Sequence, residues 1–302
     1  MATLHDIAQA ALREYGAEAQ ELRPLAEGRQ DRSIWPTGGQ YEWFSAQLLY
    51  CLVRAVKPSL MVEVATSSGY STVITGLALK RNGQGVVHTF ELDAPVAAAA
   101  ARNFTRFQVE AQVELHVGDA TQEIAKVQGI EKASICFLDG LHDAWFFRWF
   151  FKDVVSKAAD DALLHVHDVL PRDARVRFRD TPGRSPWMDL KKWVSDWALG
   201  RGLPKRLYPT VMAPTRPGEL AYMDGNWNEE AVLVNLLADH IEEGQKIYAH
   251  RWASQGLGLG ARDFDRFSQD HRDSFGRPFE WNDAFWCQAG VMKRAYQVFH
   301  GE

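Results

Sequence analysis

The sequence has few cysteines, only a small excess of negative charge and no long apolar run. The three cysteines among its 302 residues, Cys51, Cys136 and Cys287, lie far apart in apolar surroundings. We therefore expect buried, reduced thiols rather than a disulfide framework or a zinc site. The formal net charge of −5 gives no electrostatic reason to expect nucleic acid or an anionic membrane as a partner. No apolar stretch is long enough to span a bilayer, and no secretion signal is evident, so a cytoplasmic globular protein is expected.

The glycine fingerprint G-x-G-x-x-G of dinucleotide-binding folds is also absent, so a pyrophosphate is not the expected ligand. A different nucleotide-binding layout is present. An apolar run, Met61 to Val64, ends in a turn of small and hydroxyl residues, Ala65 to Ser71, where a helical pattern begins. The next apolar run, Val86 to Phe90, ends in the acid Glu91. Such a βαβ unit brings a turn and a helix N-terminus to the ligand, and its acid can bind two ribose hydroxyls.

Strands and helices alternate from residue 60 onward, which predicts an α/β fold with a doubly wound, mostly parallel sheet. The predicted strands are 60–64, 86–91, 113–117, 134–138 and 162–167, and the predicted helices are 70–81, 95–106, 121–127, 144–157 and 187–199. Two extended segments, 206–212 and 219–223, predict an antiparallel terminal hairpin that closes the sheet. Further helical patterns precede this core at 3–15 and 40–56 and follow it at 228–251 and 282–299.

These patterns divide the chain into three parts. We expect N-terminal helices and a lid over residues 1–58, a core over 59–224, and a helical C-terminal extension over 225–302 that packs on the core or mediates self-association. The aromatic stretch from Trp35 to Phe44 fits a lid and a core element equally well. The helix after Asp139 is aromatic on every side, which indicates burial.

The turn and the strand-end acids resemble the motifs of class I S-adenosylmethionine (SAM) methyltransferases, in the branch of catechol-type and macrolide-sugar O-methyltransferases. The resemblance covers about residues 40–224 and implies a Rossmann-like sheet with SAM as cofactor. It assigns cofactor contacts to Glu63, Ala65, Ser67, Ser68, Gly69, Ser71, Glu91, Leu92, Asp119, Ala120 and Asp139. Family members usually have glycine where this chain has Ala65, whose methyl group narrows the space for the ligand. Local roles are also compatible with two of the acids, because Glu63 could cap the turn and Asp119 could cap a helix.

The fourth predicted strand ends in Asp139-Gly140-Leu141-His142, which resembles the Asp-Gly-x-His pattern of sugar and small-molecule O-methyltransferases. The resemblance implies catalytic roles for Asp139, near metal and SAM, and for His142 as base. An imidazole works as a base near pH 7, so it can free a hydroxyl of its proton before attack on a sulfonium. Outside this motif, a histidine that begins a helix and bonds locally would be the simpler interpretation.

The fifth predicted strand ends in His167-Asp168, where related enzymes carry acidic ligands for a divalent cation. Asp139, His167 and Asp168 are therefore candidate metal ligands. Because Mg²⁺ prefers oxygen ligands, the histidine favours Mn²⁺, Fe²⁺ or Zn²⁺. A metal-free enzyme in which Asp168 orients His142 fits these residues equally well.

The sequence thus predicts an enzyme that transfers the SAM methyl group to a hydroxyl of a small molecule, of secondary-metabolite or sugar-like type. An N-methyltransferase without a metal would carry the same cofactor residues. A nicotinamide dehydrogenase would share Glu91, and a non-catalytic interaction protein is compatible with Ala65 and the long extension. We expect a homo-oligomer formed through residues 225–302.

Overall fold

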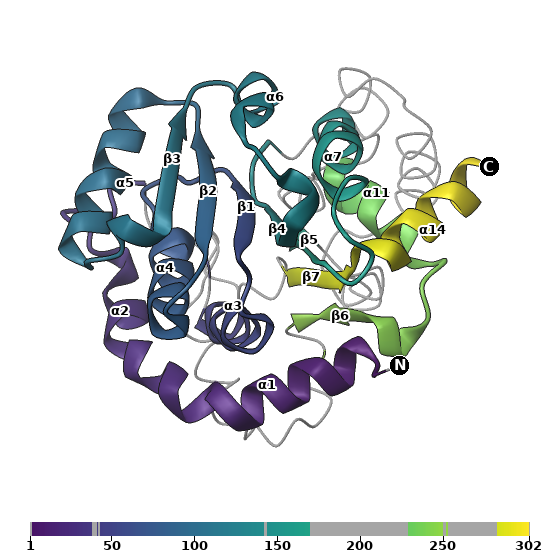
Figure 1. The fold of residues 1–302 in the computed structure, drawn as a ribbon, viewed down its shortest axis with the longest axis horizontal. Helices are drawn as coiled ribbons and strands as arrows, with labels where there is room; N and C mark the ends of the chain where they lie inside the picture. Colours follow the sequence, from purple (N-terminus) through teal and green to yellow (C-terminus); the bar gives the residue numbers. More distant parts are fainter. Residues whose placement is uncertain are drawn as a thin grey trace, which may run out of the picture.

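The computed structural model describes residues 2–37, 41, 43–141, 144–169, 229–249, 252 and 283–301. Seven strands in these ranges form one sheet in the order β3-β2-β1-β4-β5-β7-β6 (Figure 1). Their bounds are β1 (Leu60–Val64), β2 (Val86–Glu91), β3 (Val113–Val117), β4 (Ala133–Leu138), β5 (Leu163–Val169), β6 (Lys246–Tyr248) and β7 (Asp283–Gln288). The first five strands are parallel, whereas β7 runs antiparallel to both β5 and β6. The doubly wound, mostly parallel fold predicted from the sequence is confirmed.

Helices cover both faces of this sheet (Figure 1). One hydrophobic core contains residues of α1 (Leu4–Ala19), α3 (Trp43–Val56), α4 (Tyr70–Asn82) and α5 (Ala94–Arg106). The core on the other face contains residues of α6 (Ala120–Glu123), α7 (Ala144–Phe150), α11 (Glu229–Ala238) and α14 (Ala289–His300). A short helix, α2 (Arg23–Glu27), follows α1, and α7 continues into a π-helical turn at Phe151–Val155. The aromatic α7 is largely buried as predicted, with Phe147 and Phe150 inaccessible, but Trp145 at its start is exposed.

The two strands that extend the sheet beyond β5, namely β7 and β6, come from residues that were expected to be helical. The expected hairpin segments 206–212 and 219–223 and the expected helix 187–199 lie outside the described residues. The segments 228–251 and 282–299 were both expected to be helical. The first contains the helix α11 but ends in the strand β6, and the second begins with the strand β7 before the helix α14, so the prediction is wrong for the two strands. Ala284, Phe285, Trp286 and Cys287 of β7 are all buried, and a short apolar run of this kind has no periodicity that separates strand from helix. The three-part division of the chain stays a prediction, with the qualification that its last part adds two strands to the sheet.

The aromatic residues before and at the start of α3 belong to the core. Trp35 is buried, and its ring stacks on Phe107 at 5.6 Å and meets the edge of Tyr70 at 5.2 Å. Tyr41 and Trp43 are buried as well. The core interpretation therefore holds for these side chains, while residues 38–40 and 42 lie outside the described ranges and the lid role stays a prediction.

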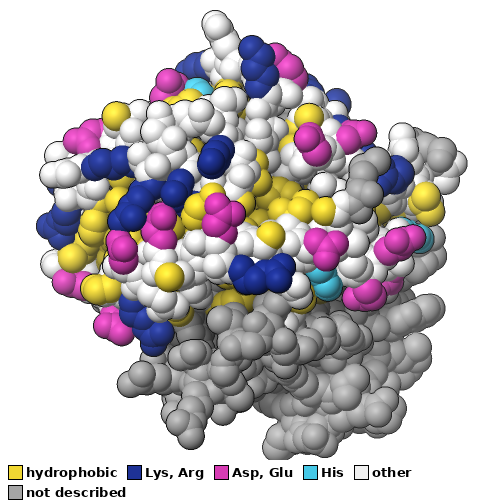
Figure 2. Space-filling model, turned by 60° about the horizontal axis from the view of Figure 1, so that its bottom comes forward, with side chains coloured by type: hydrophobic (Ala, Val, Ile, Leu, Met, Phe, Trp, Pro, Cys, Tyr) yellow, Lys and Arg dark blue, Asp and Glu magenta, His cyan; other side chains and the backbone are white. Residues whose placement is uncertain are grey.

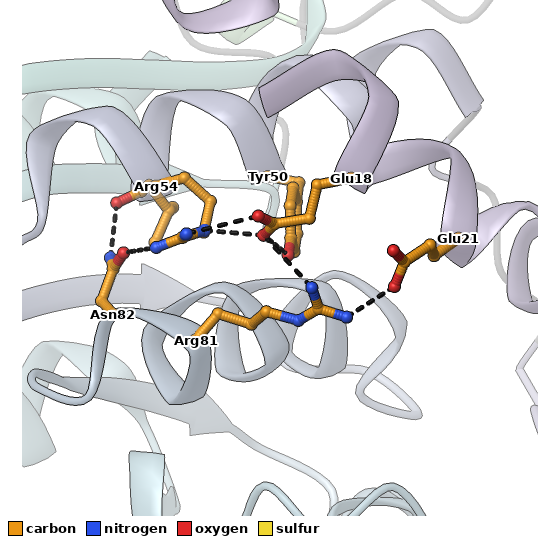
Figure 3. Close-up of polar contacts among 7 residues, drawn as sticks. Glu18, Glu21, Tyr50, Arg54, Arg81 and Asn82 are labelled. Carbon is orange, nitrogen blue, oxygen red and sulfur yellow. Dashed lines mark hydrogen bonds and ion pairs between the residues drawn. The ribbon is translucent and has the colours of Figure 1, made fainter. Parts of the chain in front are cut away.

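A polar network joins α1 to α3 and α4 (Figure 3). The Glu18 carboxylate accepts hydrogen bonds from Arg54, at 2.7 Å from Nε, and from the Tyr50 hydroxyl. Arg81 donates to Glu21 at 2.5 Å. Burial alone raises the pKa of Glu18, but the hydrogen bonds from Arg54 and Tyr50 outweigh it and lower that pKa from its ordinary value. The charged form of Glu18 therefore holds the N-terminal helix on the domain.

The charges on the surface, the lengths of the helices and the burial of the cysteines agree with what the composition led us to expect. On the described part of the face in Figure 2, Lys and Arg side chains lie among Asp and Glu side chains, and hydrophobic side chains gather near its centre. No helix in the described ranges combines the length and apolar content that a membrane crossing needs. All three cysteines are buried and outside disulfides, as predicted, and burial raises the pKa of Cys51 and of Cys136 to about 12.

Candidate active site

The sheet has a topological switch point between β1 and β4, because β1 leads to β2 on one side and β4 to β5 on the other. Ligands of open α/β sheets bind at the carboxyl edge of such a point. The sequence-predicted site residues that the structure describes lie in the last residues of these strands or shortly after them. They are Glu63 and the 65–71 turn for β1, Glu91 and Leu92 for β2, Asp119 and Ala120 for β3, Asp139 for β4, and His167 and Asp168 for β5.

Glu63 is buried near the end of β1 and is surrounded by hydroxyl donors. One carboxylate oxygen accepts from Ser71 at 2.6 Å, and the other accepts from Thr72 at 2.5 Å and Thr89 at 2.7 Å. Burial raises the pKa of Glu63, although the three hydrogen bonds oppose that shift. Its local partners are therefore side-chain hydroxyls rather than the turn N–H groups considered from the sequence. Through them, Glu63 ties the start of α4 to β2.

The turn after β1 holds the Glu91 carboxylate in place. Ala65 and Ser67 have φ values of 77° and 51°, which lie in the left-handed region. Residues other than glycine adopt this region at a cost of about 1–2 kcal/mol. The Ser67 N–H donates to Oε2 of Glu91 at 2.8 Å, and the Asp93 N–H donates to Oε1 at 3.0 Å. A carboxylate oxygen has two lone pairs, so each oxygen of Glu91 keeps a further acceptor position beyond these two bonds.

Gly69 is required at the start of α4. Its φ is 86°, and a Cβ there would lie 2.7 Å from the Phe104 ring. Glycine alone avoids both the strained dihedral and this clash. The close packing of the turn against α5 therefore depends on this residue.

Two residues that the sequence analysis missed hold the N-terminal loop against the turn. The Thr37 hydroxyl lies 2.7 Å from the hydroxyls of both Ser67 and Ser68. The Asn103 amide of α5 donates to the carbonyl groups of Ile34 at 2.8 Å and Ser68 at 2.9 Å. Neither residue has a sequence signal, because each contact joins residues that only the folded chain brings together. The predicted cofactor residues Ser67 and Ser68 are thus covered by the segment that was expected to form a lid.

The end of β3 carries a helix cap, and the end of the neighbouring strand β2 carries an exposed apolar side chain. Oδ1 of Asp119 accepts from the N–H and the hydroxyl of Thr121, at 2.9 and 2.7 Å, so the capping role considered from the sequence is present. Ala120 is buried behind it. Leu92, at the end of β2, is 72% exposed and gives this part of the edge an apolar surface. A role for these residues in cofactor binding stays a prediction.

Asp139, His167 and Asp168 converge at the ends of β4 and β5. Nδ1 of His167 lies 3.2 Å from Oδ1 of Asp139 and 3.2 Å from Oδ1 of Asp168. These three could hold a metal ion, since one donor atom of each lies within 4.8 Å of the others. Asp168 has a φ of 58°, a further left-handed position at this edge beyond Ala65 and Ser67. The predicted base His142 lies outside the described residues.

Tyr41, which the sequence placed in the lid or core stretch but not in the site, supports this cluster. Its hydroxyl lies 2.7 Å from Nε2 of His165, and its ring centre lies 4.7 Å from that of His167. Nδ1 of His165 lies 3.1 Å from the Phe285 carbonyl oxygen, which can only accept. In a neutral His165 ring, Nδ1 therefore carries the proton and Nε2 accepts from Tyr41. Tyr41 of the N-terminal segment and the Phe285 carbonyl of β7 thus hold the His165 side chain of β5 from two sides.

A second group, of two histidines and one acid, lies on one face of β2 and β3, on residues before the strand ends, and was not predicted from the sequence. Nδ1 of His88 lies 3.0 Å from Nε2 of His116 and 3.2 Å from Oε2 of Glu114. Burial lowers the pKa of both histidines. This shift favours the neutral form of both rings.

The strand order and the parallel pairing define a Rossmann-like α/β fold with acidic residues at the carboxyl edge of its sheet. Residues 62–169, from β1 to β5, match the family model described as a methyltransferase domain. Among curated proteins, the chain is similar to a catechol O-methyltransferase of Niastella koreensis, with 28% identity over 157 residues. The aligned residues cover 50% of this chain and 65% of that relative. The chain thus spans slightly less than two thirds of that relative's length. The resemblance to methyltransferases is confirmed over this region.

Two solved structures are also similar to the chain. The O-methyltransferase TomG from Streptomyces achromogenes, in complex with SAM, is 16% identical with a TM-score of 0.45, over 87% of this chain and 88% of that chain. An O-methyltransferase from Bacillus cereus, in complex with SAH, is 20% identical with a TM-score of 0.40, over 55% of this chain and 71% of that chain. Likenesses this remote carry no conclusion about the function of this protein.

Proposed function

We propose that this protein transfers the methyl group of SAM to a hydroxyl of a small molecule, of secondary-metabolite or sugar-like type. The observation that carries the proposal is the Glu91 carboxylate at the end of β2, the strand next to the switch point, where two backbone N–H groups orient it. The methyltransferase-domain match spans this position and supports SAM as the nucleotide.

The carboxyl edge of β1 and β2 suits two polar parts of SAM, the ribose hydroxyls and the methionine carboxylate. Glu91 has an acceptor position on each oxygen for the two ribose hydroxyls. The turn from Ala65 to Ser71 and the N-terminus of α4 lie beside it, where N–H groups attract a carboxylate. The apolar side chain of Leu92 and the residues Asp119 and Ala120 would border the adenine.

The donor set of Asp139, His167 and Asp168 fits a divalent cation that accepts nitrogen and oxygen ligands, such as Mn²⁺, Fe²⁺ or Zn²⁺. The separations of 3.2 Å are close to the roughly 3.0 Å between adjacent ligands of an octahedral ion with bonds of about 2.1 Å. Such an ion would lower the pKa of an acceptor hydroxyl. A charged His167 paired with both carboxylates gives similar distances, so metal dependence must be tested directly.

His142 would accept the proton of the hydroxyl during transfer, and Asp139 would position the acceptor beside it. Replacing a general base lowers turnover by about 10²–10⁴-fold. We therefore expect His142→Ala to lose turnover to this extent while SAM affinity stays unchanged. A small, pH-independent loss would assign the proton transfer to another group.

Calorimetric titration with S-adenosylhomocysteine, with and without Mn²⁺ or Mg²⁺, tests the cofactor and the metal together. Glu91→Ala should weaken binding by about 1–3 kcal/mol because charge-assisted hydrogen bonds are lost. Glu110→Ala, which removes an exposed acid outside the site, is the matched control. Unchanged affinity in Glu91→Ala contradicts the ribose assignment.

Further outcomes would identify the alternatives. Tight NAD binding without SAM binding would indicate a dehydrogenase, and no SAM binding at millimolar concentration would indicate a non-catalytic protein. Activity on an amine that EDTA does not reduce would indicate an N-methyltransferase. Self-association through residues 225–302 and a cytoplasmic location stay predictions.

A further inference from the structure

We propose that His88, Glu114 and His116 form a metal site for Zn²⁺ or a similar divalent transition metal on the face of β2 and β3. None of these residues belongs to the proposed methyl-transfer site, and the proposal does not depend on that function. Two imidazoles and one carboxylate form a donor set that suits zinc, with a fourth position left for water.

The strand register brings the three donors together. His88 on β2 is paired with Glu114 on β3, and His116 follows two residues later, opposite Phe90. Residues two apart on a strand share a face, and diagonal neighbours across two strands are within reach of long side chains. The three side chains therefore project from one face of a regular parallel pair, a placement that backbone hydrogen bonds fix.

The donor spacing is close to that of a zinc site. Ligands of a tetrahedral ion with bonds of about 2.0 Å lie about 3.3 Å apart. The distances from Nδ1 of His88 are 3.0 Å to Nε2 of His116 and 3.2 Å to Oε2 of Glu114. A single N–H on His88 cannot form two well-aligned hydrogen bonds, whereas one cation can engage all three lone pairs.

Neighbouring side chains hold the imidazole rings of His88 and His116, and the cluster is open to solvent at Glu114. His88 is buried and lies against His116, with ring centres 5.3 Å apart, and Phe90 stacks on His116 at 4.7 Å. The Glu114 side chain is 60% exposed, so an ion can reach the cluster from solvent. A bound metal would fasten the edge strand β3 to β2 next to the pair formed by Glu91 and Val117.

Zn²⁺ titration by calorimetry tests this site in a protein without an affinity tag. An Asp139→Asn/His167→Asn background removes the other candidate cluster. We expect this background to bind one Zn²⁺ per chain and to unfold at a higher temperature when Zn²⁺ is present. Addition of His116→Gln should weaken binding by at least about 100-fold, because even partners outside the ligand shell contribute 10–100-fold. His240→Gln, which changes an exposed histidine outside both clusters, should bind as the background does.

Co²⁺ provides a second measurement in the wild-type protein, which covers the case of a background variant that does not fold. Tetrahedral Co²⁺ absorbs strongly in the visible range, and this absorption should be present in the wild type and in His240→Gln and lost in His116→Gln. Circular dichroism establishes that each variant is folded. Equal Zn²⁺ stoichiometry and affinity in the wild type and His116→Gln would overturn the proposal, as would a folded background that binds no Zn²⁺.

Discussion

The two halves of the sheet, β3-β2-β1 and β4-β5-β7-β6, use acidic residues in different ways. In the first half, three hydroxyl groups of the protein surround Glu63, so this acid fixes the shape of the turn. In the second half, Asp139, His167 and Asp168 point their donor atoms at one another at the carboxyl edge. An acid enclosed by donors stabilises a fold, whereas converging donors are an arrangement that a ligand or metal can use.

The histidine–acid clusters of the two halves differ in position as well as in composition. His88, Glu114 and His116 lie on a face of the first half, whereas the cluster of the second half lies at the strand ends where α/β sheets bind ligands. Position therefore separates a candidate structural metal site from a candidate catalytic one. The following changes test this contrast between the halves.

The largest effect is expected from truncation after Asp224. The second half would lose β6 and β7, and the β5 pairing from Leu163 to Val169 would be left open. An exposed central strand with apolar side chains leads to aggregation. We expect an insoluble fragment or one without native thermal unfolding. A soluble, fully active fragment 1–224 would show that the first five strands suffice.

Glu63→Ala should be the most destabilising point change in the first half, by about 3 kcal/mol. It leaves the hydroxyls of Ser71, Thr72 and Thr89 without their shared acceptor inside the protein. Glu63→Gln keeps an oxygen acceptor and removes only the charge, so its loss should be smaller. Denaturant unfolding at pH 7 measures both, and equal losses would mean that the charge rather than the acceptor is essential.

Glu18→Gln should cost about 1–2 kcal/mol at pH 7, because charged hydrogen bonds to Arg54 are lost at a partly exposed site. Because the pKa of Glu18 is lowered from 4.5, its stabilisation is present above that pH and disappears as the pH falls through the folded-state pKa. The difference between variant and wild type should therefore shrink in acid. Glu27→Gln, which breaks an exposed pair with Arg23, should have an effect near zero at every pH.

The smallest expected effect comes from Ala65→Gly. Relief of the left-handed strain, about 1–2 kcal/mol, is offset in part by the greater freedom of glycine in the unfolded chain. A net stabilisation of about 0.5 kcal/mol should follow. Ala98→Gly, on the exposed side of α5, should instead destabilise by about 1 kcal/mol. The same sign in both variants would argue against strain at Ala65.

Much of the first half could be predicted because its signals are local. The predicted bounds of β1, β2 and β3 agree with the structure, and the strand-end acids follow from them. Contacts made through space could not be predicted, such as those of Thr37 with Ser67 and Ser68 or of Tyr41 with His165. β7 was missed for the same reason, since its short apolar run becomes a strand only by pairing with β5. The cluster of His88, Glu114 and His116 could be recognised only from the register of β2 and β3, which the sequence alone does not give.

The antiparallel strand β7 also has a consequence for the order in which the molecule assembles. Leu163 pairs with Gln288, so one of the inner ladders of the sheet joins residues far apart along the chain. Loops of this length are slow to close, and a chain made from its N-terminus displays β5 as an open edge until β7 is available. Newly made protein is therefore most open to aggregation and to chaperone binding during that interval, whatever the stability of the finished fold.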